Sequence, residues 1–208
     1  MRAALWALAL ATPAAAQEPG DFDYYILSLS WSPNWCALEG AARGAPECEE
    51  GEDLGWILHG LWPQYEDGGW PSRCAARVPD ATRRQTAAMA DIMGSDGLAW
   101  HEWQVHGTCS GLPAGEYFNL AREAYEAVAL PDVFERLPRK VSLPASLVEE
   151  AFLRADPELD AGAITVTCDE GHIQEARLCL TRDLEPRACG EGARRDCTLS
   201  DAVMEPIP

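Results

Sequence analysis

The chain has 208 residues, and 34 acidic residues against 16 basic ones give it a net charge of −18 at pH 7. This balance argues against generic adhesion to polyanions or to anionic membranes, because like charges repel. A polyanionic substrate is not excluded, since local side chains set the potential of a cleft. The charge does predict slower association with nucleic acid at low salt.

The first 16 residues have the pattern of a secretory signal peptide. Arg2 precedes the apolar run 3–11, and the small residues 14–16 fit a cleavage site before Gln17. This run is too short to span a bilayer, and no later stretch is long and apolar enough to do so. We therefore expect a secreted or periplasmic protein without a membrane segment, in which residues 17–208 form one domain.

The predicted elements begin with two strands that are joined by a loop. Residues 23–30 are rich in Tyr, Ile and Leu and predict a strand, which a Trp-Ser-Pro turn follows. The stretch 37–53 is rich in Gly, Ala, Pro and Glu, so we expect a surface loop. Residues 56–61 predict a second, buried strand, and the cluster at 66–69 turns the chain.

Helices are predicted in the middle of the chain and strands again after them. Helical composition marks three stretches, and apolar or alternating patterns mark two later strands: residues 81–93, 116–130 and 144–154, then 164–167 and 173–180. The final thirty residues are rich in loops and hold three of the cysteines. Helices gathered between strands favour an α+β fold with an antiparallel sheet core packed against several helices, rather than alternating α/β.

Eight cysteines follow the predicted signal peptide: Cys36, Cys48, Cys74, Cys109, Cys168, Cys179, Cys189 and Cys197. An even number behind an export signal predicts four disulfides in an oxidising compartment. Zinc is the alternative, but no Cys-x-x-Cys pair exists to nucleate such a site. The count alone leaves the connectivity open, because eight cysteines allow about a hundred pairings.

Three of the four histidines lie in two unusual segments, and His172 is predicted to be structural because it stands alone in a turn. His59 lies in the aromatic stretch WILHGLWPQ, and His101 and His106 enclose Glu102 in HEWQVHGTC. Histidine titrates near neutrality and suits proton transfer. If residues 101–106 are helical, Glu102 and His106 share a face with Cβ atoms about 5–6 Å apart. The pattern predicts an acid–base active site.

A metal-dependent phosphohydrolase built on His59, His101 and Glu102 is the chemical alternative. The zincin pattern requires two histidines at i and i+4, whereas His101 and His106 are at i and i+5. We therefore expect no metal and no cofactor, and inhibition by EDTA would identify the alternative.

The motif His59-Gly60-Leu61-Trp62-Pro63 and the segment 101–109 resemble the two active-site segments of the ribonuclease T2 family. Residues 23–33 resemble the first strand of that family, and the resemblance extends over nearly all of residues 17–208. It implies an endoribonuclease of low base specificity. Such an enzyme cleaves single-stranded RNA without metal, by transphosphorylation through a 2′,3′-cyclic phosphate.

The resemblance also implies roles for the site residues. His106 would take the proton of the ribose 2′-hydroxyl, His59 would protonate the departing 5′-oxygen, His101 would bind the phosphate, and Glu102 would stabilise the phosphorane. Trp62 would stack on a base and Gln64 would bind its edge, with Trp70 a weaker stacking candidate. The implied disulfides are Cys36–Cys48, Cys74–Cys109, Cys168–Cys197 and Cys179–Cys189.

Position 105 departs from the family pattern. The family commonly has lysine immediately before the last histidine of the second motif, and this chain has Val105. Loss of such a cation could cost about 10²–10³ in rate, unless Arg73 or Arg77, the nearest candidates in sequence, replaces it. Val105 and the acidic charge therefore support an alternative, a catalytically weakened T2-like RNA-binding or interaction protein. Single-stranded RNA is the expected partner, and a monomer without a stable protein partner is expected.

Overall fold

The computed structural model describes residues 17–75 and 77–208, so the predicted signal peptide lies outside the described residues. One six-stranded sheet has the order β2-β1-β5-β6-β3, and β4 also pairs with β5. All pairings are antiparallel except a single parallel pair between β5 and β6. The strands are β1 (Tyr24–Trp31), β2 (Trp56–Gln64), β3 (Val141–Leu143), β4 (Ile164–Asp169), β5 (His172–Leu180) and β6 (Ala202–Met204).

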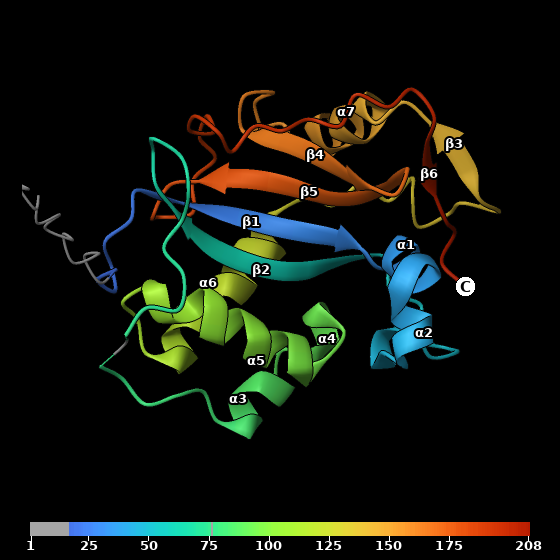
Figure 1. The fold of residues 1–208 in the computed structure, drawn as a ribbon. Coiled ribbons are helices and arrows are strands. Elements are labelled where there is room, and N and C mark those ends of the chain that lie inside the picture. Colours follow the sequence, from blue (N-terminus) through green and yellow to red (C-terminus); the bar gives the residue numbers. More distant parts are fainter. Residues whose placement is uncertain (1–16, 76) are drawn as a thin grey trace, which may run out of the picture.

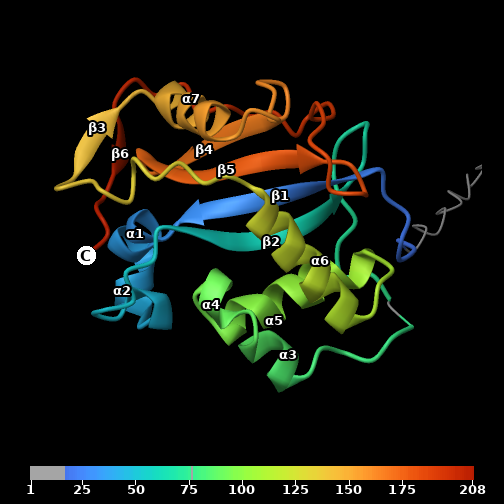
Figure 2. The same ribbon diagram turned by 180° about the vertical axis from the view of Figure 1, so that it is seen from behind.

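Helices lie toward both edges of this sheet, which confirms the predicted α+β fold. Figures 1 and 2 show α3 to α6 gathered on the β2 side, whereas α7 lies beside β4. The α-helices are α1 (Ser32–Trp35), α2 (Ala41–Arg43), α3 (Arg83–Ala87), α4 (Ala90–Met93), α5 (Asp96–Val105), α6 (Ala114–Ala127) and α7 (Ser146–Ala155). No helix among residues 17–75 and 77–208 combines the length and apolar character needed to cross a bilayer.

The core lies between the sheet and the helices, and α6 and α7 both contribute to its main apolar cluster. All eight residues of β1 are buried, as expected for a strand between two neighbours. Leu27 and Leu29 of β1 join Leu58 and Leu61 of β2 in the main apolar cluster, together with Tyr117 of α6. The Tyr117 hydroxyl donates to the Leu61 carbonyl oxygen at 2.9 Å. This bond fixes α6 against β2 at a point close to His59.

Three of the predicted elements need correction. The expected loop 37–53 is partly helical, because helix-forming residues continue α1 through a π-helical turn (Cys36–Gly40) into α2, which ends where Gly44 adopts φ 65°. The expected helix 81–93 is two short helices, α3 and α4. Strand β2 runs on through Pro63 to Gln64, which is possible because β2 is an edge strand and Pro63 has no amide proton to pair.

The four disulfides have the predicted pairing: Cys36–Cys48, Cys74–Cys109, Cys168–Cys197 and Cys179–Cys189. A tight turn joins the strands that were predicted at residues 164–167 and 173–180. Asp169 pairs with His172, and Glu170 and Gly171 between them have φ values of 44° and 80°. Two positive φ values are typical of the tight hairpin turn that matches strand twist.

Candidate active site

A β-bulge in β2 positions His59. In the β1–β2 register Ser28 is opposite Gly60 and Leu29 is opposite Leu58, so His59 is the extra residue on the edge strand. In a regular strand, residues three apart point to opposite faces. The bulge shifts the alternation by one, so that His59 and Trp62 come together while Leu58 and Leu61 both remain in the core.

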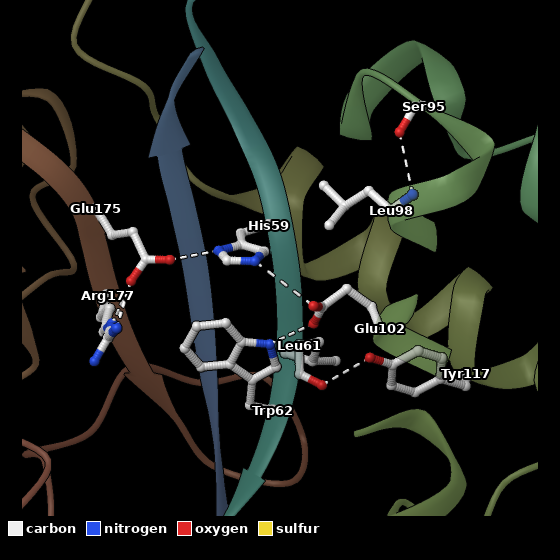
Figure 3. Close-up of polar contacts among 9 residues, drawn as sticks. All are labelled: His59, Leu61, Trp62, Ser95, Leu98, Glu102, Tyr117, Glu175 and Arg177. Atoms are coloured by element: carbon white, nitrogen blue, oxygen red, sulfur yellow. Dashed lines mark hydrogen bonds and ion pairs between the residues drawn. The ribbon is translucent and has the colours of Figure 1, made fainter. Parts of the chain in front are cut away.

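Helix α5 carries the second histidine segment and confirms that residues 101–105 are helical. It begins at Ser95, whose Oγ accepts a hydrogen bond from the Leu98 amide at 3.1 Å (Figure 3). It ends at His106, which has φ −118° and follows the last helical residue. The next turn, Gly107–Cys109, is fixed by the Cys74–Cys109 disulfide, and the Arg73 amide donates to the Val105 carbonyl oxygen at 2.8 Å.

Glu102 points from α5 toward β2 and is 2% exposed. One carboxylate oxygen accepts a hydrogen bond from Trp62 Nε1 at 2.6 Å, and the other lies 3.6 Å from His59 Nε2 (Figure 3). On the opposite side of the His59 ring, Nδ1 donates to Glu175 Oε1. Glu102 and His106 were expected to share a helical face, but the hydrogen-bond and ion-pair partners of the Glu102 carboxylate are on β2. Glu102 instead joins β2 to α5 through Trp62 and His59.

The indole of Trp62 lies between the two imidazoles. Its ring centroid is 5.2 Å from that of His59, nearly perpendicular, and 5.1 Å from that of His106, which stacks on it at 28°. The Nδ1 atom of His106 is buried and has no hydrogen-bond partner among the described residues. The stacking on Trp62, rather than a hydrogen bond to the ring, therefore orients the imidazole of His106.

A pocket of about 790 Å³ opens beside these rings. Its lining includes all three residues predicted to bind substrate, Trp62, Gln64 and Trp70, together with Val105, His106 and Arg177. The Trp70 ring is 55% exposed, whereas Gln64 is 6% exposed. His106 and Arg177 occupy positions over the Trp62 ring. Trp70 is therefore the more open aromatic surface for a planar ligand.

The two imidazoles differ in their affinity for a proton. Burial lowers the pKa of His106 to about 3, and the charges of His59, His101 and Arg73 act in the same direction. Burial also opposes the charged form of His59, but the hydrogen bond and charge of Glu175, with the charge of Glu102, raise its pKa above the ordinary 6.5. The site therefore favours the protonated form of His59 and the neutral form of His106.

Two acidic side chains flank His59, and their pKa values are shifted in opposite directions. Burial raises the pKa of Glu102, although His59 and the Trp62 indole favour its ionised form. Burial would also raise the pKa of Glu175, but the hydrogen bond and charge of His59, with the charge of Arg177, lower it to about 2. Glu175 is therefore ionised throughout the neutral range and is the firm counter-ion of His59.

Three further residues were predicted to act at the site: His101, Arg73 and Arg77. His101 is exposed on α5, and its charge reaches His106. Arg73 is also exposed and acts on His106 by charge, whereas Arg77 lines a separate pocket beside Pro19 and Thr108. Within residues 17–75 and 77–208, no three His, Cys, Asp or Glu side chains are grouped as a metal ion would require.

Glu175 and Arg177 were not predicted from the sequence, and they lie two residues apart on β5. Both contact groups at the site, Glu175 through His59 and Arg177 through Trp62 and the pocket. A signal was present in the sequence, because two charged residues at i and i+2 lie within a strand whose other residues are mostly apolar. Charged groups in such a position are rarely buried unless they are paired.

The chain is similar to known proteins in sequence and in fold. The model of the ribonuclease T2 family matches residues 22–189. A ribonuclease of Aeromonas hydrophila is 44% identical over 109 residues, which cover 52% of this chain and 47% of that protein. The chain spans about half the length of the first curated relatives it matches.

Two solved structures have the same fold. Trichomaglin, described as a novel S-like ribonuclease, has a TM-score of 0.69 and 21% identity, covering 90% of this chain and 100% of that one. An RNase-related protein from Calystegia sepium has a TM-score of 0.67 and 20% identity, covering 90% and 97%.

Proposed function

Because the chain belongs to the ribonuclease T2 family, we propose that it is an endoribonuclease that cleaves single-stranded RNA by transphosphorylation without a metal ion. The observation that carries this proposal is the pair of imidazoles on either side of Trp62, whose pKa values are shifted in opposite directions. One imidazole favours the neutral form that accepts a proton and the other favours the protonated form that donates one, as a two-histidine mechanism requires.

Each of the two histidines transfers one proton in this reaction. The free ring nitrogen of neutral His106 takes the proton of the ribose 2′-hydroxyl, and the resulting oxygen attacks the adjacent phosphorus. His59 gives its Nε2 proton to the 5′-oxygen as the bond between phosphorus and that oxygen breaks. The products are a 2′,3′-cyclic phosphate and a free 5′-hydroxyl. Hydrolysis of the cyclic ester uses the same groups with their roles reversed.

Two further residues complete this proposal. His101, exposed beside the site, contributes positive charge to the phosphate when it is protonated, and Glu102 holds Trp62 and His59 together around the phosphorane. The base stacks on Trp70, because His106 and Arg177 already lie over the Trp62 ring, and Gln64 contacts the base edge from the same pocket. Stacking on indole tolerates every base, which supports low base specificity.

The pKa shifts predict a broad activity profile on the acid side of neutrality. The base His106 is active above its pKa of about 3, and the acid His59 is active below its raised pKa, which exceeds 6.5. In kcat/KM against pH, we expect the acid limb near pH 3 and the alkaline limb above pH 6.5. A profile that rises through pH 6.5 and stays high above pH 9 would contradict these assignments.

Gly60 is expected to be essential to the arrangement of the site. A Cβ atom at this position would lie 2.1 Å from Glu102 Oε2 and 2.4 Å from Trp62 Nε1, so Gly60→Ala must displace one of them. We expect kcat/KM for RNA to fall on the order of 10²-fold, because displacements of about 1 Å have effects of this size.

Gly97→Ala is the matched control for this substitution. A Cβ atom at Gly97 would meet only Ser95 Oγ at 3.9 Å, and alanine favours the helix. Wild-type cleavage by Gly60→Ala, or an equal loss in Gly97→Ala, would show that the close approach at Gly60 is unimportant.

Cleavage of single-stranded RNA by the purified, oxidised protein in EDTA tests the proposal. Resistance to EDTA and products with 2′,3′-cyclic phosphate ends are expected. Loss of all cleavage in EDTA, restored by a divalent cation, would instead support a metal-dependent phosphohydrolase.

A second candidate, a T2-like binding protein with weak turnover, is favoured by one observation. Val105 lies on the pocket wall beside His106 and brings no charge there. If the wild-type protein bound a single-stranded RNA oligonucleotide tightly between about pH 4 and 8 but did not cleave it, this candidate would be supported over the enzyme.

We further propose that the protein works as a monomer in the periplasm or outside the cell, without a stable protein partner. Four disulfides support an oxidising compartment. Among the described residues, the exposed large apolar side chains come from five separate places in the chain: Trp70, Trp100, Val133, Leu147 and Leu199. Sedimentation of the purified protein and fractionation of the source cells test these two points.

A further inference from the structure

A single buried carboxylate joins the proton donor to the pocket. Glu175 is 1% exposed, and its two oxygens have different partners. Oε1 accepts the hydrogen bond from His59 Nδ1, and Oε2 accepts from Arg177 Nε at 2.7 Å, with Arg177 Nη2 at 2.5 Å (Figure 3). The guanidinium of Arg177 then lies 5.2 Å from the Trp62 ring centroid and lines the pocket.

The strand order explains how these groups meet. His59 is on β2 and Glu175 on β5, with β1 between them. The residues of β1 paired with Glu175 and Arg177 are Ser30 and Ser28, and both serines are small and buried. Larger side chains at these two positions would fill the space over β1. The serines therefore leave room for His59 to reach Glu175 across the middle strand.

We infer that Glu175 is the positioning residue of His59 and that Arg177 is the cation that the pocket presents to the phosphate of the substrate. This inference rests on the proposed function. Glu175 keeps a proton on Nδ1 of His59, so that Nε2 is the atom that gives its proton away. Arg177 uses two of its nitrogens on Glu175, and the stacking on Trp62 holds the planar guanidinium at the pocket wall.

The charge of the pocket supports the assignment of Arg177. Among the described residues that line it, the arginines are Arg177 and Arg195. Arg195 is exposed, whereas the Arg177 side chain is 27% exposed and held by the buried Glu175. A cation held in place before the substrate binds stabilises developing negative charge better than a free one does. It also provides local attraction for phosphate on a chain whose net charge is −18.

Replacing Glu175 and replacing Arg177 should shift the pKa of His59 in opposite directions. The ring is faced by Glu175 and Arg177 from β5, by Glu102 and His106 from α5 and its end, and by Glu47 from the turn Pro46–Cys48. Glu175→Gln removes the charge that favours imidazolium while burial continues to oppose it, so the His59 pKa falls. Arg177→Met removes a positive charge that opposes imidazolium, so the His59 pKa rises.

NMR titration of the imidazole C2–H resonances measures these pKa values in the folded protein without substrate. We expect the His59 pKa to fall by about one unit or more in Glu175→Gln and to rise in Arg177→Met. His172, the first residue of β5, contacts Glu170 and Glu205 rather than the site and provides the internal reference. Glu150→Gln is the control for loss of an arginine-paired carboxylate at the surface. An unchanged His59 pKa in both variants would overturn the inference, because a purely structural pair would not shift it in opposite directions.

Inhibition of RNA cleavage by inorganic phosphate tests the role of Arg177 in binding. We expect the inhibition constant to increase about tenfold in Arg177→Met, to recover in part in Arg177→Lys, and to stay unchanged in Arg182→Met, whose guanidinium lies over Phe22 instead. Equal inhibition of all four proteins would overturn the assignment of Arg177. Failure of the proposed function would appear separately, as absence of cleavage by the wild-type protein, since the NMR titration requires no turnover.

Discussion

Replacing His106 with alanine is expected to reduce kcat for RNA cleavage by about 10²–10⁴-fold, the usual contribution of a general base. His106 has its pKa lowered to about 3, so it is neutral in nearly the whole range in which proteins are handled. Its Nδ1 has no partner among the described residues, and its ring is held by stacking on Trp62. Removal of the imidazole therefore leaves no buried charge without a counter-ion, and the fold should survive.

The effect should fall on turnover rather than on binding. Trp70, Gln64 and Arg177 remain in place in His106→Ala, so KM is expected to change by less than about threefold. His172→Ala is the control, since this histidine contacts the Glu170 carbonyl oxygen and lies near Glu205, away from the pocket. If His106→Ala retained more than a tenth of the wild-type kcat, another group would have to be the base.

Removing the Cys74–Cys109 disulfide is expected to cost about 4 kcal/mol of unfolding free energy, since it closes a loop of 35 residues. The bond also joins the chain after β2 to the turn that follows His106. A Cys74→Ala/Cys109→Ala variant should therefore lose RNA cleavage even at a temperature at which it is folded, because His106 is no longer held against Trp62. Chemical denaturation and cleavage assays on the same sample measure the two effects.

The Cys36–Cys48 disulfide provides the comparison. It closes a loop of 12 residues, so a Cys36→Ala/Cys48→Ala variant should lose about 3 kcal/mol, nearly as much. Neither cysteine lines the pocket beside His106. The folded form of this variant should therefore keep cleavage close to the wild-type rate. Equal losses of activity in the two variants would mean that the Cys74–Cys109 bond only stabilises the fold.

Much of the fold could be predicted from local patterns. The four longer strands, the turn at Glu170 and Gly171, and helices α6 and α7 follow from apolar periodicity and turn residues that tertiary contacts do not override. The disulfide pairing came from the family resemblance, because the cysteine count leaves it open. The helical segment from α1 to α2 was missed, since its Gly, Ala and Pro content is typical of loops as well as of short helices.

The histidines of the site could be predicted from the sequence, but most of the residues that contact them could not. The spacing of His59 and Trp62 indicates opposite faces of a strand, and only the bulge opposite Ser28 and Leu29 brings them together. Bulges depend on cross-strand register, which a single strand does not reveal. Glu175 and Arg177 reach the site across the sheet from a strand more than a hundred residues away in the chain. No local spacing relates them to His59.

Cleavage of a DNA strand that contains one ribonucleotide, in EDTA at pH 5, tests whether His106 activates a ribose 2′-hydroxyl while His59 protonates the leaving oxygen. We predict a single cut, at the phosphate on the 3′ side of the ribose, that leaves a 2′,3′-cyclic phosphate and a 5′-hydroxyl. A strand with a 2′-O-methyl group at that ribose should remain intact. Cleavage of the methylated strand, or products with 5′-phosphate ends, would contradict the two-histidine mechanism.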